Sequence, residues 1–161
     1  MRTLIVYYSL EGNTAWAAER LAEQLGAEQL RLEPEKAYPS SGVKKFLWGG
    51  KSAVMGEEPP LKPYAFRGED WDRIIFGFPV WAGNPTPPLR TFIKEQGAAL
   101  REKSLAAFAC ESGAGGEKAL GKLTALLGRE RLDAELILID PKSKPDPDNE
   151  TKLTAFAKKL P

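Results

Sequence analysis

The feature that most constrains this chain is a strand-like segment near its start that is apolar on both faces. Residues 3–8, Thr-Leu-Ile-Val-Tyr-Tyr, are mostly β-branched or aromatic. A strand with one face in water alternates apolar and polar side chains, whereas a central strand of a parallel sheet is apolar throughout. Residues 72–78 end in the same way, with Ile-Ile-Phe-Gly-Phe. Both segments therefore predict central strands of a parallel sheet.

Amphipathic helical stretches alternate with such strands along the chain. We predict strands at residues 3–8, 29–32, 72–78, 104–110 and 134–139. We predict helices after residue 14, at 89–100, at 117–127 and after residue 149, and a further helix at 43–54 that Gly49-Gly50 interrupts. This order predicts an α/β fold with helices on both faces of a parallel sheet. The 161 residues show no repeat and no linker, so one domain is expected over residues 1–161.

The composition excludes several classes of chemistry. The chain has no histidine and one cysteine, Cys110, which excludes Ser-His and Cys-His catalysis and argues against a metal site. With 23 basic and 22 acidic residues the net charge is +1, so neither nucleic acid nor an anionic membrane is an expected partner. The sequence shows no signal-peptide pattern and no membrane-length apolar run, and the cytoplasm is the expected compartment.

Three loops of unusual composition follow the first, third and fourth strands. In open α/β sheets ligands bind beyond the carboxyl ends of the strands, so these loops are the candidate site. In the first loop, Gly12 permits close backbone approach, and Ser9 and Thr14 offer hydroxyls. The helix that follows presents unpaired N–H groups and a partial positive charge, which suit a phosphate. An ordinary strand-to-helix turn remains an alternative.

The second and third loops add a flat side chain and exposed backbone. Trp81 lies among small and rigid residues in the loop 79–85, where an indole can stack on a planar ring; a core tryptophan at the sheet edge is the alternative. The Gly-rich loop 110–116 offers backbone N–H groups to ring carbonyls or nitrogens, unless it is only a flexible connection. Together the loops favour a planar ligand that carries a phosphate.

Two of these loops resemble motifs of a known family. Residues 7–14, YYSLEGNT, resemble the flavodoxin phosphate-loop signature (S/T)-x-x-G-N-T, and residues 77–88, GFPVWAGNPTPP, resemble the G-x-PVW-x-G ring loop of bacterial flavodoxin-like proteins. Residues 46–51, FLWGGK, are similar to a stretch between the second and third strands of that subgroup. The resemblance implies a three-layer, flavodoxin-like fold with a five-stranded parallel sheet of order 2-1-3-4-5 and one bound FMN.

The resemblance also implies which residues hold the cofactor. The phosphate would be bound by Ser9, Leu10, Glu11, Gly12, Asn13 and Thr14. The isoalloxazine ring would be flanked by Pro79, Val80, Trp81, Ala82 and Gly83. The pyrimidine edge of the ring would be lined by Cys110, Glu111, Ser112, Gly113 and Gly116.

The function implied is electron transport through FMN, with two forms left open. Glu11 places a carboxylate by the phosphate, the third loop has no aromatic residue, and the chain is not acidic; the last two features favour one accessible flavin face. The protein is thus either an electron carrier served by a redox partner protein or an oxidoreductase that reacts with NAD(P)H, a quinone or another small molecule. It is expected to be a monomer or homodimer. No residue is assigned a catalytic role, and Gly83 is expected to absorb a peptide rotation beside the ring.

One non-redox alternative shares the expected fold. A response-regulator receiver domain needs acidic residues at the end of its first strand and a phosphorylatable aspartate at the end of its third. This chain has Tyr7-Tyr8-Ser9 and Phe78-Pro79 at those positions. The sequence therefore argues against a receiver domain.

Overall fold

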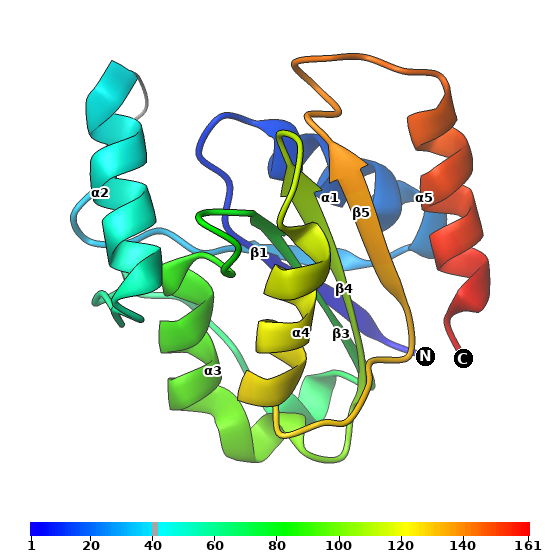
Figure 1. The fold of residues 1–161 in the computed structure, drawn as a ribbon. Helices are drawn as coiled ribbons and strands as arrows, with labels where there is room; N and C mark the ends of the chain where they lie inside the picture. The colour runs from blue at the N-terminus through cyan, green and yellow to red at the C-terminus, as the bar shows by residue number, and fades with distance from the viewer. Residues whose placement is uncertain (40–41) are drawn as a thin grey trace.

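The computed structural model describes residues 1–39 and 42–161 (Figure 1). The strands are β1 (Thr3–Tyr7), β2 (Glu28–Arg31), β3 (Arg73–Pro79), β4 (Ser104–Glu111) and β5 (Glu135–Ile139). The helices are α1 (Asn13–Leu25), α2 (Gly42–Val54), α3 (Pro87–Leu100), α4 (Gly116–Leu126) and α5 (Asp148–Lys159), and a short 3-10 helix, η1 (Gly68–Asp70), precedes β3.

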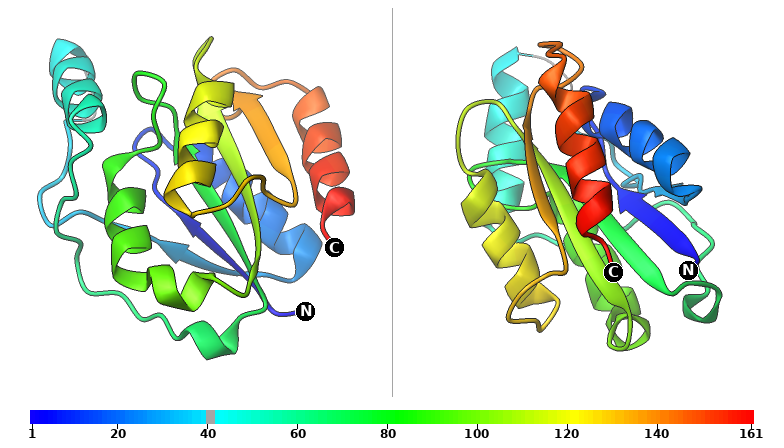
Figure 2. Two further views of the ribbon diagram at one scale, coloured as in Figure 1. Left: turned by 60° about the horizontal axis from the view of Figure 1, so that its bottom comes forward. Right: turned by 90° about the vertical axis from the view of Figure 1, so that its right-hand side faces the viewer.

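The strands form a parallel sheet of order β2-β1-β3-β4-β5, which confirms the predicted fold and strand order. Figure 2 shows α1 and α5 on one face of the sheet and α3 and α4 on the other. Because the strands run in one direction, all of their carboxyl ends meet at one edge, at the top of Figure 1. The three loops that the sequence singles out leave this edge after β1, β3 and β4.

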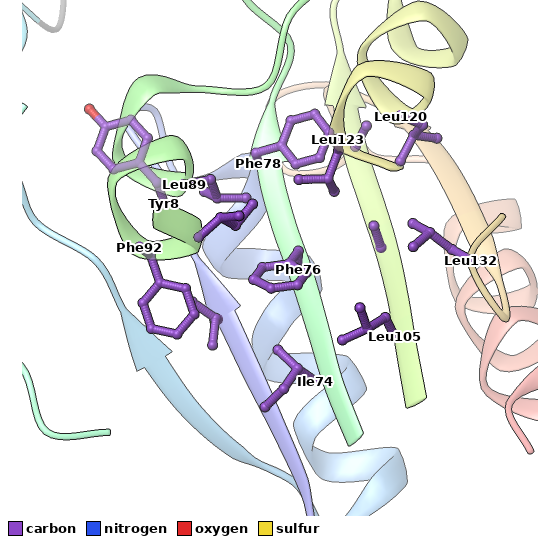
Figure 3. Close-up of a cluster of buried hydrophobic side chains, with 14 of the residues drawn as sticks. Tyr8, Ile74, Phe76, Phe78, Leu89, Phe92, Leu105, Leu120, Leu123 and Leu132 are labelled. Atoms are coloured by element: carbon purple, nitrogen blue, oxygen red, sulfur yellow. The ribbon is translucent and has the colours of Figure 1, made fainter. Parts of the chain in front are cut away.

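The apolar strands divide their side chains between two buried cores. Along β1, Leu4 and Val6 join the core under α3 and α4, whereas Ile5 joins the core under α1 and α5, as the twofold alternation of a strand requires. Figure 3 shows the first core, where Phe76 of β3 lies near Phe92 of α3. Each large side chain fully removed from water contributes about 1.5–3 kcal/mol, so both cores stabilise the packing of the helices on the sheet.

The second helix departs from the prediction. The helix α2 is continuous from Gly42 to Val54, so an interruption at Gly49-Gly50 is wrong. A Cβ on Gly49 would lie 3.2 Å from Cε3 of Trp81, and its absence lets the helix lie against the indole. A glycine inside a helix costs roughly 1 kcal/mol, and at position 49 the absence of a side chain permits this close packing. The packing therefore places α2 beside the carboxyl edge of the sheet.

Within residues 1–39 and 42–161, each helix is too short or too polar to span a lipid bilayer.

Candidate functional site

A cavity of about 410 Å³ opens at the carboxyl edge of the sheet, within the size range of small-ligand sites. All three predicted loops contribute to its wall. The lining residues are Ser9, Leu10, Glu11, Asn13, Thr14, Gly50, Pro79, Val80, Trp81, Ala82, Cys110, Ser112, Gly113, Ala114 and Asp140. The cavity thus brings together residues that are distant in the sequence, such as Ser9 and Asp140, which lie 131 positions apart.

The first loop turns directly into α1. Gly12 has φ 101°, in the left-handed region that favours glycine, and α1 begins at the next residue. The hydroxyl oxygen of Ser9 accepts the N–H of Ala15 at 3.2 Å, so it satisfies one of the donors that a helix start leaves unpaired. The Ser9 O–H can still donate into the cavity. The loop therefore has the form of an anion cradle at a helix N-terminus.

Thr14 carries the strongest sign of a ligand in this loop. Its side chain is 1% exposed, and within the described part of the chain its hydroxyl has no hydrogen-bond partner. A buried polar group without a partner costs about 1–3 kcal/mol, and buried polar groups in proteins are nearly always paired. Because Thr14 lines the cavity, an oxygen of a bound ligand is the natural partner of this hydroxyl.

Cys110 lies against the same buried hydroxyl and is inert. Burial raises the pKa of the Cys110 thiol to about 12, and the neighbouring Thr14 hydroxyl, which does not reach hydrogen-bond geometry with the sulfur, opposes this rise only in part. The side chain is 5% exposed. A thiol that stays protonated is a poor nucleophile and a poor metal ligand. Cys110 therefore forms part of the cavity wall as a small, buried apolar residue.

The second loop is a tight hairpin that side-chain hydrogen bonds of Asn84 stabilise. Trp81 and Asn84 exchange two backbone hydrogen bonds of 3.1 and 3.0 Å, and the two residues between them, Ala82 and Gly83, have φ 51° and 70°. The Asn84 side chain donates to the Ala82 carbonyl at 2.8 Å and accepts from Lys122 Nζ at 2.6 Å. Alanine in the left-handed region costs about 1–2 kcal/mol, so these contacts hold a strained backbone at the cavity wall.

The indole of Trp81 is fixed by two tyrosines as well as by Gly49. Its centroid lies 5.6 Å from the ring of Tyr8 and 5.1 Å from that of Tyr38, both edge-on. The Tyr38 hydroxyl lies 2.9 Å from the Ser52 hydroxyl of α2. Trp81 thus lines the cavity and packs on the core at once, which unites the two interpretations that the sequence leaves open.

Four predicted residues lie outside the lining of the cavity and shape its loops instead. Glu111 caps α4, because its Oε2 accepts the N–H of Gly116 at 2.7 Å. A Cβ on Gly116 would lie only 2.7 Å from that same oxygen. Gly12 and Gly83 adopt the positive φ angles that their turns need. These roles are conformational, so the residues do not form the wall itself.

Three lining residues are absent from the sequence prediction, and Asp140 is the most informative of them; the others are Gly50 and Ala114. Asp140 directly follows β5 and has φ 38°, and its carboxylate accepts from the Ser112 hydroxyl at 3.1 Å. Its side chain is 15% exposed. The rule that ligands bind at strand carboxyl ends applies to β5 as to the other strands, and it points to this residue.

Comparisons with known proteins agree with this fold. The sequence model of the flavodoxin family matches residues 2–132. A flavoprotein from Lactobacillus acidophilus NCFM, solved in complex with FMN, is 20% identical with a TM-score of 0.70, over 88% of this chain and 95% of that one. A flavoprotein from Bacteroides eggerthii DSM 20697 is 20% identical with a TM-score of 0.74, over 99% and 97%. A WrbA-like flavodoxin from Agrobacterium tumefaciens is 20% identical with a TM-score of 0.61, over 98% and 93%.

Proposed function

The chain belongs to the flavodoxin family, and from that premise we propose that it binds one FMN in the cavity at the carboxyl edge of its sheet and acts in electron transfer. The observation that carries the proposal is the buried, unpartnered hydroxyl of Thr14 at the start of α1. A phosphate oxygen is a strong acceptor, and the helix start adds N–H donors and a partial positive charge.

The wall fits the two chemically different ends of FMN. Ser9 and Thr14, beside the start of α1, suit the phosphate. Trp81 and the backbone of Ala82 suit the flat ring, and the loop around Ser112 suits its polar edge. Bound FMN would supply electron transfer, since its ring takes up and releases electrons with a proton.

The chain's own part in that chemistry is to fix the backbone at Ala82 and Gly83. The Ala82 carbonyl accepts from the Asn84 amide, which Lys122 holds in turn. A rotation of the peptide between Ala82 and Gly83 would release that amide, and Gly83 has the conformational freedom for the change. We propose that this hydrogen bond sets how readily the peptide presents its carbonyl or its N–H to the ring. Replacement of Gly83 by a β-branched residue should therefore shift the reduction potentials of bound FMN in a redox titration.

The second candidate function is an FMN-dependent NAD(P)H:quinone reductase or a related small-molecule reductase. The third loop contributes only the small residues Cys110, Ser112, Gly113 and Ala114 to the wall, so its side chains leave room for a second planar molecule beside the ring. Steady oxidation of NAD(P)H by the purified holoprotein, with a quinone as acceptor, would support the reductase. Reduction only through a partner protein would support the carrier.

The FMN proposal is tested by titration of FMN and measurement of the quenching of flavin fluorescence. Thr14→Val removes the hydroxyl and keeps the shape, whereas Thr14→Ser keeps the hydroxyl as a matched control. A hydrogen bond to a charged acceptor contributes about 1.5–3 kcal/mol, so Thr14→Val should raise the Kd about 10- to 150-fold. The proposal is wrong when the wild-type protein takes up no FMN, or when Thr14→Val binds it as well as the wild type.

A further inference from the structure

The loop between β5 and α5 is fastened to the first loop of the site. The side-chain oxygen of Asn13 accepts the backbone N–H groups of Lys142 at 2.9 Å and Ser143 at 3.0 Å. Asn13 is the first residue of α1 and is 7% exposed. Figure 1 shows the fastened loop, in orange, running from the carboxyl end of β5 to the start of α5. A fourth segment therefore borders the proposed phosphate site.

This attachment brings a cation onto the phosphate loop. A Cβ on Gly12 would lie 2.9 Å from Nζ and 3.1 Å from Cδ of Lys142, so the lysine side chain lies over the residue that precedes α1. In the described part of the chain Lys142 forms no ion pair, whereas Lys144 of the same loop lies 3.6 Å from the Asp140 carboxylate. The ammonium group and the helix start together provide positive charge on one loop.

We propose that Lys142 binds the phosphate dianion and makes the site selective for phosphorylated over unphosphorylated flavin. The inference rests on the proposed function, because it assigns a further residue to the same FMN site. Two observations support it independently: the unpartnered Thr14 hydroxyl marks where an acceptor is expected, and the Lys142 side chain lies on the glycine next to that helix start. The anchored backbone at Asn13 lowers the ordering cost of holding the lysine there.

Two carboxylates in the cavity wall explain why a lysine beside the phosphate site would matter. Glu11 and Asp140 line the same cavity as the Thr14 hydroxyl, and both carboxylates would repel a phosphate dianion. Asp140 is engaged by Ser112 and Lys144, so part of its charge is offset within the loop. Lys142 adds a positive charge at this loop and would form a charge-assisted contact of the kind that binds phosphates.

The test compares the Kd values of FMN and riboflavin, which differ only in the phosphate. We expect Lys142→Gln to raise the Kd of FMN by about tenfold or more and to leave the Kd of riboflavin unchanged. Lys142→Arg should restore most of the lost FMN affinity. Lys158→Gln makes the same charge change on an exposed lysine in the last turn of α5, at the end of that helix away from the cavity, and should alter the ratio of the two Kd values by less than about threefold. Because counterions compete with a lysine–phosphate contact, the salt dependence of the FMN Kd should also flatten in Lys142→Gln.

Each outcome separates this inference from the function on which it rests. If the wild-type protein binds neither flavin, the proposed function fails and the inference fails with it. If the wild type binds FMN and Lys142→Gln keeps the same FMN-to-riboflavin ratio and the same salt dependence, only the role of Lys142 is overturned. If Lys142→Gln lowers the affinities for FMN and riboflavin equally and also lowers the melting temperature, Lys142 acts in the folding of the loop, and its proposed role in phosphate binding is overturned.

Discussion

Replacement of Gly77 by alanine should destabilise the protein through one identifiable contact. Gly77 lies in β3 opposite Phe108 of β4. A Cβ at position 77 would lie 2.2 Å from Cζ of Phe108 and 2.7 Å from both Cε atoms, far inside van der Waals contact. Phe108 is fully buried in the core under α1 and α5. The first glycine of the G-x-PVW-x-G stretch is therefore required for packing.

The size of the effect follows from how little room the ring has. Overpacking a core by one methyl group costs about 1–3 kcal/mol, and the value for Gly77→Ala should lie in the upper half because the ring is enclosed. Gly121 provides the matched control: it is an exposed residue in α4, and a Cβ there meets nothing within 4 Å. Gly121→Ala should stabilise by up to about 1 kcal/mol.

Urea unfolding followed by circular dichroism measures both changes, and a double mutant tests their cause. Phe108→Leu removes the far end of the ring and leaves a void, so it destabilises alone. In the double mutant Gly77→Ala/Phe108→Leu, the void left by Phe108 accommodates the new methyl group. The double mutant should therefore be more stable than the sum of the two single effects predicts, by about 1 kcal/mol or more. A Gly77→Ala change below about 0.5 kcal/mol, or a strictly additive pair, would refute the packing argument.

Three further predictions concern the site. Cys110 should react with iodoacetamide far more slowly in the native than in the unfolded protein at pH 8.5. Because burial raises the pKa of its thiol from 9.0 to about 12, the stability of the folded state that depends on the protonated thiol is complete below pH 9 and is lost as the pH rises toward 12. Cys110→Ala should remove this loss of stability at high pH. Asn13→Ala should cost about 1–3 kcal/mol in unfolding free energy by leaving the N–H groups of Lys142 and Ser143 without their acceptor, and an unchanged melting temperature would contradict this. Glu111→Ala should cost about 0.5–2 kcal/mol through the lost cap of α4, whereas Glu111→Gln, which keeps an acceptor, should cost less.

The sheet was predictable because its physical cause is local. Residues 3–8 and 72–78 are apolar on both faces, and such strands are stable only in the middle of a covered sheet. The rule that ligands bind at carboxyl ends then selected loops whose residues Ser9, Trp81 and Ser112 do line one cavity. Twelve of the sixteen predicted site residues are in that wall, since Gly12, Gly83, Glu111 and Gly116 are not.

The features that the sequence did not predict depend on contacts between segments that are distant in the chain. Gly49-Gly50 predicts a break when only helix propensity is considered, but the indole of Trp81 fills the space that the missing Gly49 side chain leaves. Glu111 resembles a site residue by position, yet its carboxylate caps α4. The charges at 140–144 have the composition of a solvated loop. Contacts with distant residues show that this loop joins the site, among them the Asn13 side chain, 129 positions before Lys142.

Amide NMR shifts during an FMN titration report whether FMN binds at the carboxyl edge of the sheet. Binding there predicts that the largest shifts fall in residues 10–14, 80–84 and 111–114, the three loops around the cavity. It is contradicted when FMN shifts no amides, or when the largest shifts fall at the opposite end of the sheet, where Arg2, Gly26 and Trp71 border a second cavity of about 360 Å³.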